Sequence, residues 1–400
     1  MVDEEFVSTC GAEEVTEWKE EPRVVLAKPL SLEGESEVDE KAPNLILLVL
    51  SLFTNIRPGS DLTGMQLPPA FNIPKSQLQC ISEPVYCVKN DMLETCNRRE
   101  NPVDRFSAVV AWSISTIRPL NFGFAPFNPI LGETHHVSRG TLNVLLEQVS
   151  HHPPVTALHA TDDEENVELL WCQYPTPRFY GTSVETEVRG KRHLKLHNHG
   201  ETYEMSSPKL LIKLIPVPGV DWIGKDRIRC QETGLEAELD YGGKSFFGLR
   251  GSHRSIKGKI FKSSSMKLLF KIDGHWDRTV TIKDVNSGEV TVIYNAKDSI
   301  SGLKTPIVKD HKGLWPSESA VVWSEVNKGI LSKDLAQAKE AKKAIEEKQR
   351  EILRARESSS SGGHQTWVPQ HFIVSINKEG GWDCSPIEIK VPPAPIIVPL

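Results

Sequence analysis

The chain lacks a long apolar run. Its longest, Leu45–Phe53, spans nine residues, whereas a helix that crosses a membrane needs about 20. The first ten residues are acidic where a secretory signal peptide would be basic and then apolar. The net charge of −6 gives no support to nucleic-acid binding, which favours basic domains. We therefore expect a soluble protein that binds no nucleic acid.

Paired cysteine motifs and glycosylation sites are missing as well. No CxxC pair and no N-x-S/T sequence occur, and the number of cysteines is odd. The seven are Cys10, Cys80, Cys87, Cys96, Cys172, Cys230 and Cys384. We expect free thiols in a reducing compartment, with no structural zinc or disulfide framework. This pattern favours a cytoplasmic location and no bound cofactor.

Negative charge gathers at the start of the chain. Residues 1–41 carry 13 acidic and 4 basic side chains, and the remainder is close to neutral. We predict an acidic, mobile arm that solvates a globular body. A second interpretation starts from Glu4, Glu5 and Phe6, which loosely resemble an acid-flanked motif that binds an endoplasmic-reticulum receptor. That receptor protein is therefore a candidate partner.

The apolar run Leu45–Phe53 lies in a segment, residues 42–60, that continues into a Pro/Gly turn. By itself it fits a buried helix or strand, or an apolar flap over a ligand cavity. A clearer helix is expected from Asn101, which can cap it, to about Leu120. Its apolar face consists of Val103, Phe106, Val110, Ile114 and Ile117.

Between about residues 120 and 315 the pattern is that of strands. Short runs alternate apolar and polar side chains and are separated by Gly, Pro, Asn and Asp. No alternation of strands with helices appears, which argues against a doubly wound parallel sheet. So many consecutive strands must close or pack to hide their edges, and a large barrel has room for a ligand. We predict a mainly β protein.

The last part of the chain turns helical and then irregular. Residues 318–357 keep an apolar stripe at Trp323, Val326, Ile330 and Ala338, followed by a highly charged stretch. Residues 358–366 are rich in Ser and Gly and predict a flexible linker. Residues 367–400 hold a strand-like piece and end in a Pro-rich segment.

The sequence Glu147–Pro154 places two adjacent histidines, His151 and His152, before two prolines. In a strand their side chains would point to opposite faces, but a bend at the prolines can bring both imidazoles together. Such a pair can donate hydrogen bonds to an anion, and its charge is tunable near neutral pH. A metal pair or an acid/base pair is the alternative at this point.

The string EQVSHHPP resembles the fingerprint of the oxysterol-binding-protein-related family. A second family element, NPILGE, stands at Asn128–Glu133. The third is Lys-x-x-x-Glu-x-x-x-Arg at Lys342, Glu346 and Arg350, which share one helical face. The signature residues are Glu133, Glu147, Gln148, Ser150, Pro153 and Pro154. The resemblance covers residues 42–357 and is greatest to short plant members with only the lipid-binding domain.

The resemblance implies an incomplete antiparallel β-barrel around a lipid tunnel, with an N-terminal lid at about residues 42–60 and C-terminal helices. The tunnel would take a sterol, and the headgroup of phosphatidylinositol 4-phosphate would sit at its mouth under the histidines. The headgroup residues would be Asn128, His151, His152, Lys342, Glu346 and Arg350. The lid would use Leu45, Leu48, Leu52 and Phe53. The implied function is lipid transfer between membranes, without covalent chemistry.

One position departs from the family pattern. Ala125 stands before Pro-Phe-Asn-Pro, where the family commonly has a lysine that contacts phosphate. A hydrogen bond to a charged group contributes about 1.5–3 kcal/mol. Its loss would weaken headgroup binding by roughly ten- to a hundred-fold. Phosphoinositide binding is therefore less well supported than sterol binding.

Other functions remain as alternatives. The same pocket could serve a lipid sensor or scaffold at membrane contact sites, in which lid closure changes partner binding. A hydrolase built on Ser150 and an adjacent histidine lacks a G-x-S-x-G elbow. A metal site could draw on the two histidine pairs and His159, but their spacing matches no H-E-x-x-H signature. These histidines are His135, His136, His151, His152 and His159.

Overall fold

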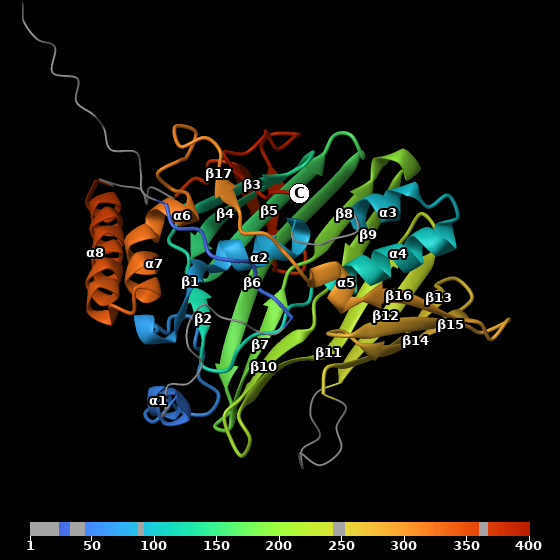
Figure 1. Ribbon diagram of the computed structural model, residues 1–400, viewed down its shortest axis with the longest axis horizontal. Helices are drawn as coiled ribbons and strands as arrows, with labels where there is room; N and C mark the ends of the chain where they lie inside the picture. Colours follow the sequence, from blue (N-terminus) through green and yellow to red (C-terminus); the bar gives the residue numbers. More distant parts are fainter. Residues whose placement is uncertain (1–23, 33–44, 87–91, 243–252, 360–366) are drawn as a thin grey trace, which may run out of the picture.

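A computed structural model describes residues 24–32, 45–86, 92–242, 253–359 and 367–400 (Figure 1). The acidic residues 1–23 and 33–41, and with them the receptor motif, lie outside this part of the chain. Residues 24–32, part of the predicted arm, contact the folded body. Ala27 is buried, and the main-chain N–H of Leu30 donates to Glu83 at 3.0 Å. The segment is apolar apart from Lys28 and Ser31, so burial of its side chains is favourable.

One 16-stranded sheet dominates the molecule, as the alternating pattern predicts. Its strands are β3 (Thr134–Arg139), β4 (Leu142–His151), β5 (Pro154–Asp162), β6 (Val167–Phe179), β7 (Ser183–Arg189), β8 (Arg192–Leu196), β9 (Glu201–Met205), β10 (Lys209–Lys213), β11 (Gly219–Cys230), β12 (Leu235–Gly242), β13 (Ser255–Lys262), β14 (Lys267–His275), β15 (Thr279–Asp284), β16 (Val290–Asn295), β17 (Ile307–Val308) and β20 (Ile396–Ile397).

The sheet curls without closing. Its order runs from β16 through β11, β6 and β3 to β20 and β17. Within the described residues the two end strands, β16 and β17, do not pair with each other. All pairings in it are antiparallel except that of β20 with β3. Two strand pairs connect the long strands β6 and β11. The pair β7–β10 lies along one part of these strands, and the pair β8–β9 lies along the other. The result is the expected mainly β, incomplete barrel.

The remaining elements are short, apart from two helices. They are α1 (Leu45–Leu52), a 3-10 turn η1 (Pro69–Phe71), β1 (Asn72–Ser76), α2 (Gln77–Tyr86), α3 (Met92–Arg98), α4 (Pro102–Ser115), β2 (Ala125–Phe127), a second 3-10 turn η2 (His197–His199), α5 (Ala296–Ile300), α6 (Ser319–Val322), α7 (Ser324–Leu331), α8 (Leu335–Ser359), β18 (Phe372–Ile376) and β19 (Trp382–Pro386).

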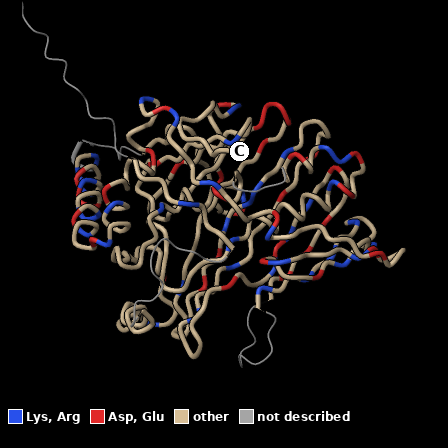
Figure 2. The backbone as a smooth tube through the Cα atoms, in the orientation of Figure 1, with Lys and Arg blue, Asp and Glu red and all other residues tan. Residues whose placement is uncertain are grey.

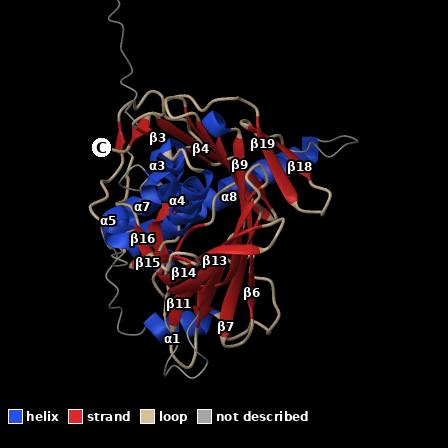
Figure 3. Ribbon diagram, turned by 90° about the vertical axis from the view of Figure 1, so that its right-hand side faces the viewer, coloured by secondary structure: helices blue, strands red, loops and turns tan. Residues whose placement is uncertain are grey.

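Helix α4 fills the concave side of the sheet, which curves around it in Figure 3. Its start follows the predicted cap, because the side chain of Asn101 accepts a hydrogen bond from the N–H of Val103 at 2.8 Å. Most of the predicted apolar face is buried in the main core, and Val103 is partly buried against it. The helix ends at Ser115, before the predicted end, so the buried Ile117 lies just beyond it. Arg105 leaves the opposite side and donates from Nε to the buried Glu201 at 2.8 Å, which ties the helix to β9.

The C-terminal helices form a second core. The predicted stripe of Trp323, Val326, Ile330 and Ala338 is buried there, and Trp323 stacks on Phe127 of β2 with ring centroids 4.4 Å apart. Helix α8 continues to Ser359, two residues past its predicted end. Figure 2 shows acidic and basic residues interspersed along it. Within the described residues, no helix combines the length and the apolar character needed to span a membrane.

Candidate functional site

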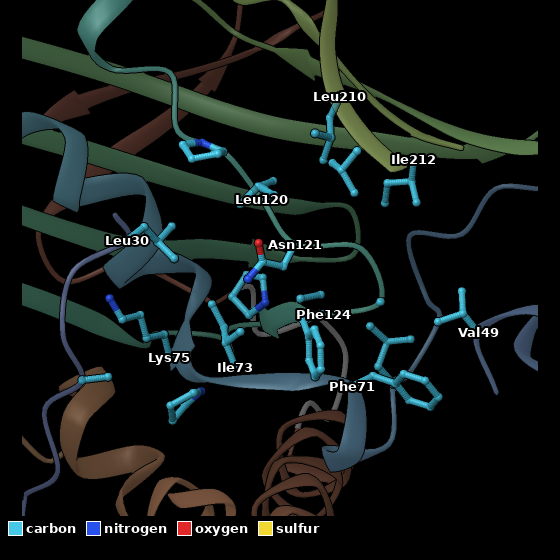
Figure 4. A pocket seen from close by; sticks show the side chains of 18 of the residues that line it. Leu30, Val49, Phe71, Ile73, Lys75, Leu120, Asn121, Phe124, Leu210 and Ile212 are labelled. Carbon is cyan, nitrogen blue, oxygen red and sulfur yellow. The ribbon is translucent and has the colours of Figure 1, made fainter. Parts of the chain in front are cut away.

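An apolar cavity of about 190 Å³ lies between α1, the η1–β1 segment and strands β10 and β11 (Figure 4). Hydrocarbon side chains supply most of its wall, so it suits a lipid rather than a polar metabolite. Its lining consists of Ala27, Lys28, Leu30, Val49, Leu52, Phe53, Leu67, Phe71, Ile73, Pro74, Lys75, Pro119, Leu120, Asn121, Gly123, Phe124, Ala125, Pro126, Leu210, Ile212 and Val220.

Helix α1 covers one side of this cavity. Leu52 and Phe53, both expected in the lid, line it, and Phe53 stacks on Phe179 of β6 at 5.1 Å. Leu45 packs against Gly123, where an added Cβ would lie 3.0 Å from the leucine side chain. Val49, which the sequence reasoning missed, is buried and lines the cavity.

Leu48 lies on the other side of α1. Its side chain is 48% exposed, and it is not among the described residues that line the cavity. Together with Ile46 and Leu47 it forms what we call the outer apolar face of α1. Because nearly every position of this helix is apolar, the sequence pattern could not tell the inward face from the outward one.

Few polar side chains reach the cavity. In Figure 4 Lys75 and Asn121 are labelled at its edge. The ammonium of Lys75 forms a buried ion pair with Glu83 of α2. No motif pointed to Lys75. Its position follows from the parallel pairing of β1 with β2, which places it beside the Ala125–Phe127 strand.

The fingerprint lies at the end of β4. Glu147 is buried and accepts main-chain hydrogen bonds from Gln370 at 2.8 Å and His371 at 2.9 Å. Burial raises the pKa of Glu147, and these two hydrogen bonds oppose the shift. Gln148 accepts from Thr156 of β5 at 2.6 Å and donates to the main-chain oxygen of Ser150 at 3.0 Å.

A register shift between Gln148 and Ser150 interrupts the pairing of β4 with β5. Beyond it the His152–Pro153 peptide bond is cis, and Pro154 begins β5. The prolines therefore bend the chain as predicted. The two imidazoles lie on the same side of this bend, with ring centroids 4.6 Å apart and planes inclined by 65°.

His151 is held by the other family motif. Its Nδ1 lies 2.9 Å from the main-chain oxygen of Pro129, next to the exposed Asn128. Burial, and then the neighbouring His152, lowers the pKa of His151. Both effects favour the neutral form of this imidazole. His152 is exposed.

Glu133, the last residue of NPILGE, anchors the Asn128–Glu133 loop to the interior of the protein. It is fully buried and accepts from the hydroxyls of Ser76 and Ser319, from the indole N–H of Trp323 at 2.9 Å and from the N–H of Ile130 at 3.0 Å. Burial raises the pKa of Glu133, although all four donors favour the carboxylate. The loop that contacts His151 is thus bound to β1, to α6 and to Trp323, which lies between α6 and α7.

The helical triad lies on α8. Lys342 donates to the main-chain oxygen of Leu67 and to the side chain of Asn72 at 3.0 Å, and Asn72 in turn donates to the oxygen of Ala125 at 3.1 Å. Burial lowers the pKa of Lys342, and Glu346 opposes the shift. Arg350 is 52% exposed and lies 3.6 Å from Glu346.

The structure thus ties each group of predicted headgroup residues to the Ala125–Glu133 segment. His151 is tied to it through Pro129, and Lys342 through Asn72 and Ala125. None of the six predicted headgroup residues is among the described residues that line the cavity, whereas Ala125 is. Sequence reasoning named both groups as candidates but did not name Asn72 and Pro129, which connect them to this segment.

The histidines considered for a metal site have separate partners. His135 Nδ1 lies 2.7 Å from Glu318, His136 Nε2 lies 2.8 Å from the oxygen of Pro392, and His159 faces Glu168. Across the described residues, no three His, Cys, Asp or Glu side chains gather as a metal site would require.

A family model for oxysterol-binding protein matches residues 50–388. The chain belongs to the oxysterol-binding protein family. Over 378 residues it is 55% identical to oxysterol-binding protein-related protein 4B of Arabidopsis thaliana, covering 94% of this chain and 97% of that protein. With related protein 4C of the same plant the identity is 54% over 380 residues, covering 94% and 99%. Members of this family bind lipids and are not enzymes.

Solved structures of this family share the fold. The Osh1 ORD domain, crystallised with cholesterol, matches with a TM-score of 0.71 and 21% identity over 91% of this chain and 90% of that chain. The Saccharomyces cerevisiae Osh3 ORD, solved in complex with PI(4)P, matches with a TM-score of 0.64 and 22% identity over 90% and 93%. At such identities the likeness establishes the fold.

Proposed function

We propose that this protein binds a sterol in the cavity under α1 and carries it between membranes. The observation that carries the proposal is the cavity itself, whose wall is nearly all hydrocarbon and whose cover is a short helix. Burial of a sterol removes several hundred Å² of apolar surface from water, which contributes on the order of 10 kcal/mol at about 25 cal/mol per Å². That is enough to compensate for leaving a bilayer.

The outer face of α1 supports membrane contact. Ile46, Leu47 and Leu48 are 48%, 65% and 48% exposed, next to the residues that line the cavity. An apolar face that water does not solvate well would enter the interface of a bilayer. Insertion would draw α1 away from the cavity mouth and open it toward the lipid. The protein would act peripherally and transiently on membranes from the cytoplasm.

A second lipid, phosphatidylinositol 4-phosphate, is proposed to bind with its headgroup near the two histidines. The donors would be His151, His152, Lys342 and Arg350, with Asn128 as an amide donor and Glu346 orienting the cations. The support is that His151 and Lys342, one from each motif, both connect to the Ala125–Glu133 segment, which also contains Asn128. Exchange of the two lipids would drive transport in one direction.

Liposome extraction tests this function. The full chain is incubated with vesicles that contain a fluorescent sterol, with and without phosphatidylinositol 4-phosphate. Extraction of both lipids, each reducing the other, supports exchange. Extraction of the sterol alone would show that the phosphoinositide takes no part in transport. Extraction of neither lipid would reject the proposal. Changing His151 and His152 to Ala should abolish phosphoinositide extraction and largely spare the sterol; equal loss would make the pair structural.

A sensor function is the alternative, and one observation favours it. Ala27, Lys28 and Leu30 line the cavity and precede residues 33–41, which continue the acidic sequence. A bound lipid would contact this segment and so change the affinity of the N-terminal region for a partner. Transfer rate separates the two functions, because a sensor binds lipid tightly but moves too little between vesicles.

A further inference from the structure

The C-terminal hairpin of β18 and β19 packs on the outside of the fingerprint region. Figure 3 shows it beside the strands of the main sheet. Strand β19 contacts β5 and β6, and β18 contacts β4. Phe372 of the hairpin is buried with Val149 and Val155 of β4 and β5. The residues directly before it, Gln370 and His371, donate the two hydrogen bonds that hold Glu147.

Two free cysteines face each other across this contact. Cys172 lies in β6 and Cys384 in β19, 212 positions apart in the chain, and their sulfurs are 2.6 Å apart. A disulfide bond is about 2.05 Å long, so an approach of roughly half an ångström would join them. Neither strand must leave its sheet for that movement.

We propose that Cys172 and Cys384 form a reversible disulfide that locks the C-terminal hairpin onto the sheet. The oxidant would be a peroxide. The Cys384 thiolate attacks one peroxide oxygen, so that an S–O bond forms, the O–O bond breaks and an alcohol or water leaves. The Cys172 sulfur then attacks the resulting sulfenic acid, the S–O bond breaks and water departs. The two thiols lose two electrons and two protons, which the peroxide takes up.

The environments of the two thiols set this order. Cys384 is partly exposed and can meet a peroxide, whereas Cys172 is buried. The hydrogen bond with Cys384, together with burial, raises the pKa of the Cys172 thiol. A thiol is a poor nucleophile until it loses its proton. Cys172 therefore acts second, when the sulfenic acid is already in contact with it.

The bond would act on the site through Glu147. Opening of the hairpin removes Gln370 and His371 from that buried carboxylate and exposes the strand that carries His151. A second contact connects the residues before the hairpin to the sheet. The ring of Trp315 stacks between those of His136 in β3 and His371, with centroid distances of 5.2 and 4.7 Å. A covalent link between β19 and β6 restricts this opening, since the hairpin can no longer drift away.

Mass spectrometry of the full chain tests the proposal. The protein is treated with hydrogen peroxide, alkylated and digested without reductant. A peptide pair joined through Cys172 and Cys384, released by dithiothreitol, is the expected result. The pair should be absent in Cys384→Ser and present in the control Cys80→Ser. Oxidation of Cys384 to sulfinic acid with Cys172 still alkylated would overturn the assignment, as would pairing of either residue with another cysteine.

Hydrogen exchange tests the consequence. Main-chain amides of residues 372–386 should exchange at least several-fold more slowly in the oxidised protein, and Cys384→Ser should show no change upon oxidation. Because Cys384 is partly exposed, this variant is expected to fold even if Cys172→Ser does not. Equal exchange in the reduced and cross-linked protein would overturn the locking role. Lipid does not enter either measurement, so the result is independent of the proposed transport function.

Discussion

The imidazole of His151 donates its Nδ1 hydrogen to the main-chain oxygen of Pro129, 2.9 Å away. A carbonyl oxygen can only accept, so this contact places the proton of the neutral ring on Nδ1. The other nitrogen, Nε2, then carries a lone pair and cannot donate to a phosphate oxygen. To bind an anion through Nε2, His151 must take up a second proton.

Phosphoinositide affinity should therefore depend on pH. Burial and His152 depress the pKa of His151, which favours the neutral ring. A bound phosphate would raise that pKa, and binding would take up a proton. We expect affinity to fall as pH rises from 6.5 to 8, by up to about tenfold per pH unit. Vesicle extraction at several pH values measures this slope.

Two controls isolate the histidine from the rest of the system. Sterol has no titratable group, so its extraction should stay level over the same pH range. In His151→Ala with His152→Ala, which should abolish phosphoinositide extraction, no dependence of extraction on pH should remain. A steep slope that survives in the double variant would assign the proton uptake to the phosphate or to another residue.

Ala125→Lys should strengthen phosphoinositide binding. Ala125 lines the cavity, and its main-chain oxygen accepts from Asn72, which also contacts Lys342. A lysine there would add one charge-assisted hydrogen bond, about 1.5–3 kcal/mol, or roughly ten- to a hundred-fold in affinity. Ala125→Met is the matched control, with similar length and no charge. An equal gain in both variants would show that packing, not charge, is responsible.

The two faces of α1 should respond differently to a charge. Val49→Asp puts a carboxylate on the cavity wall and should lower sterol affinity by about ten- to a hundred-fold, the cost of desolvating a polar group. Leu47→Asp acts on the side that is 65% exposed. It should leave binding from cyclodextrin unchanged and slow extraction from vesicles. Equal effects of both variants in both assays would contradict the orientation of the helix.

Glu133 should be a strong determinant of stability. Glu133→Ala leaves the donors of Ser76, Ser319, Trp323 and Ile130 without their acceptor and should cost about 3 kcal/mol or more. Glu133→Gln keeps one oxygen for the two N–H donors, and the serine hydroxyls can turn to accept from its amide. We expect it to cost roughly 1 kcal/mol. Urea unfolding compares the three proteins.

The comparison of wild type with Glu133→Gln also gives a test of pH dependence. Burial raises the pKa of Glu133, so the folded state binds more protons at this position than the unfolded chain does. Its contribution to stability falls as pH rises from the ordinary pKa of a glutamic acid toward the raised one. The stability difference between wild type and Glu133→Gln should therefore shrink over that range. A difference that grows with pH would mean that the four donors outweigh burial.

Local pattern was enough for individual elements. The cap at Asn101 and the apolar positions of α4 follow from helical spacing, and the stripe around Trp323 follows in the same way. Strands β4, β12, β13 and β14 coincide with runs of alternating polarity. The family motifs identified Glu133, the fingerprint and the triad on α8. These signals are local because backbone geometry fixes which neighbours along the chain share a face.

Contacts between distant elements were decided only by the tertiary structure. A helix that is apolar all round does not specify its buried side, so packing against β6 and β10 placed Val49 inward and Leu48 outward. Strand order and register decide three further contacts. These are the packing of residues 24–32, the position of Lys75 beside β2 and the contact of Cys172 with Cys384. No periodicity encodes such pairings, since they bring together residues that are far apart in the chain and whose approach is set by the fold as a whole.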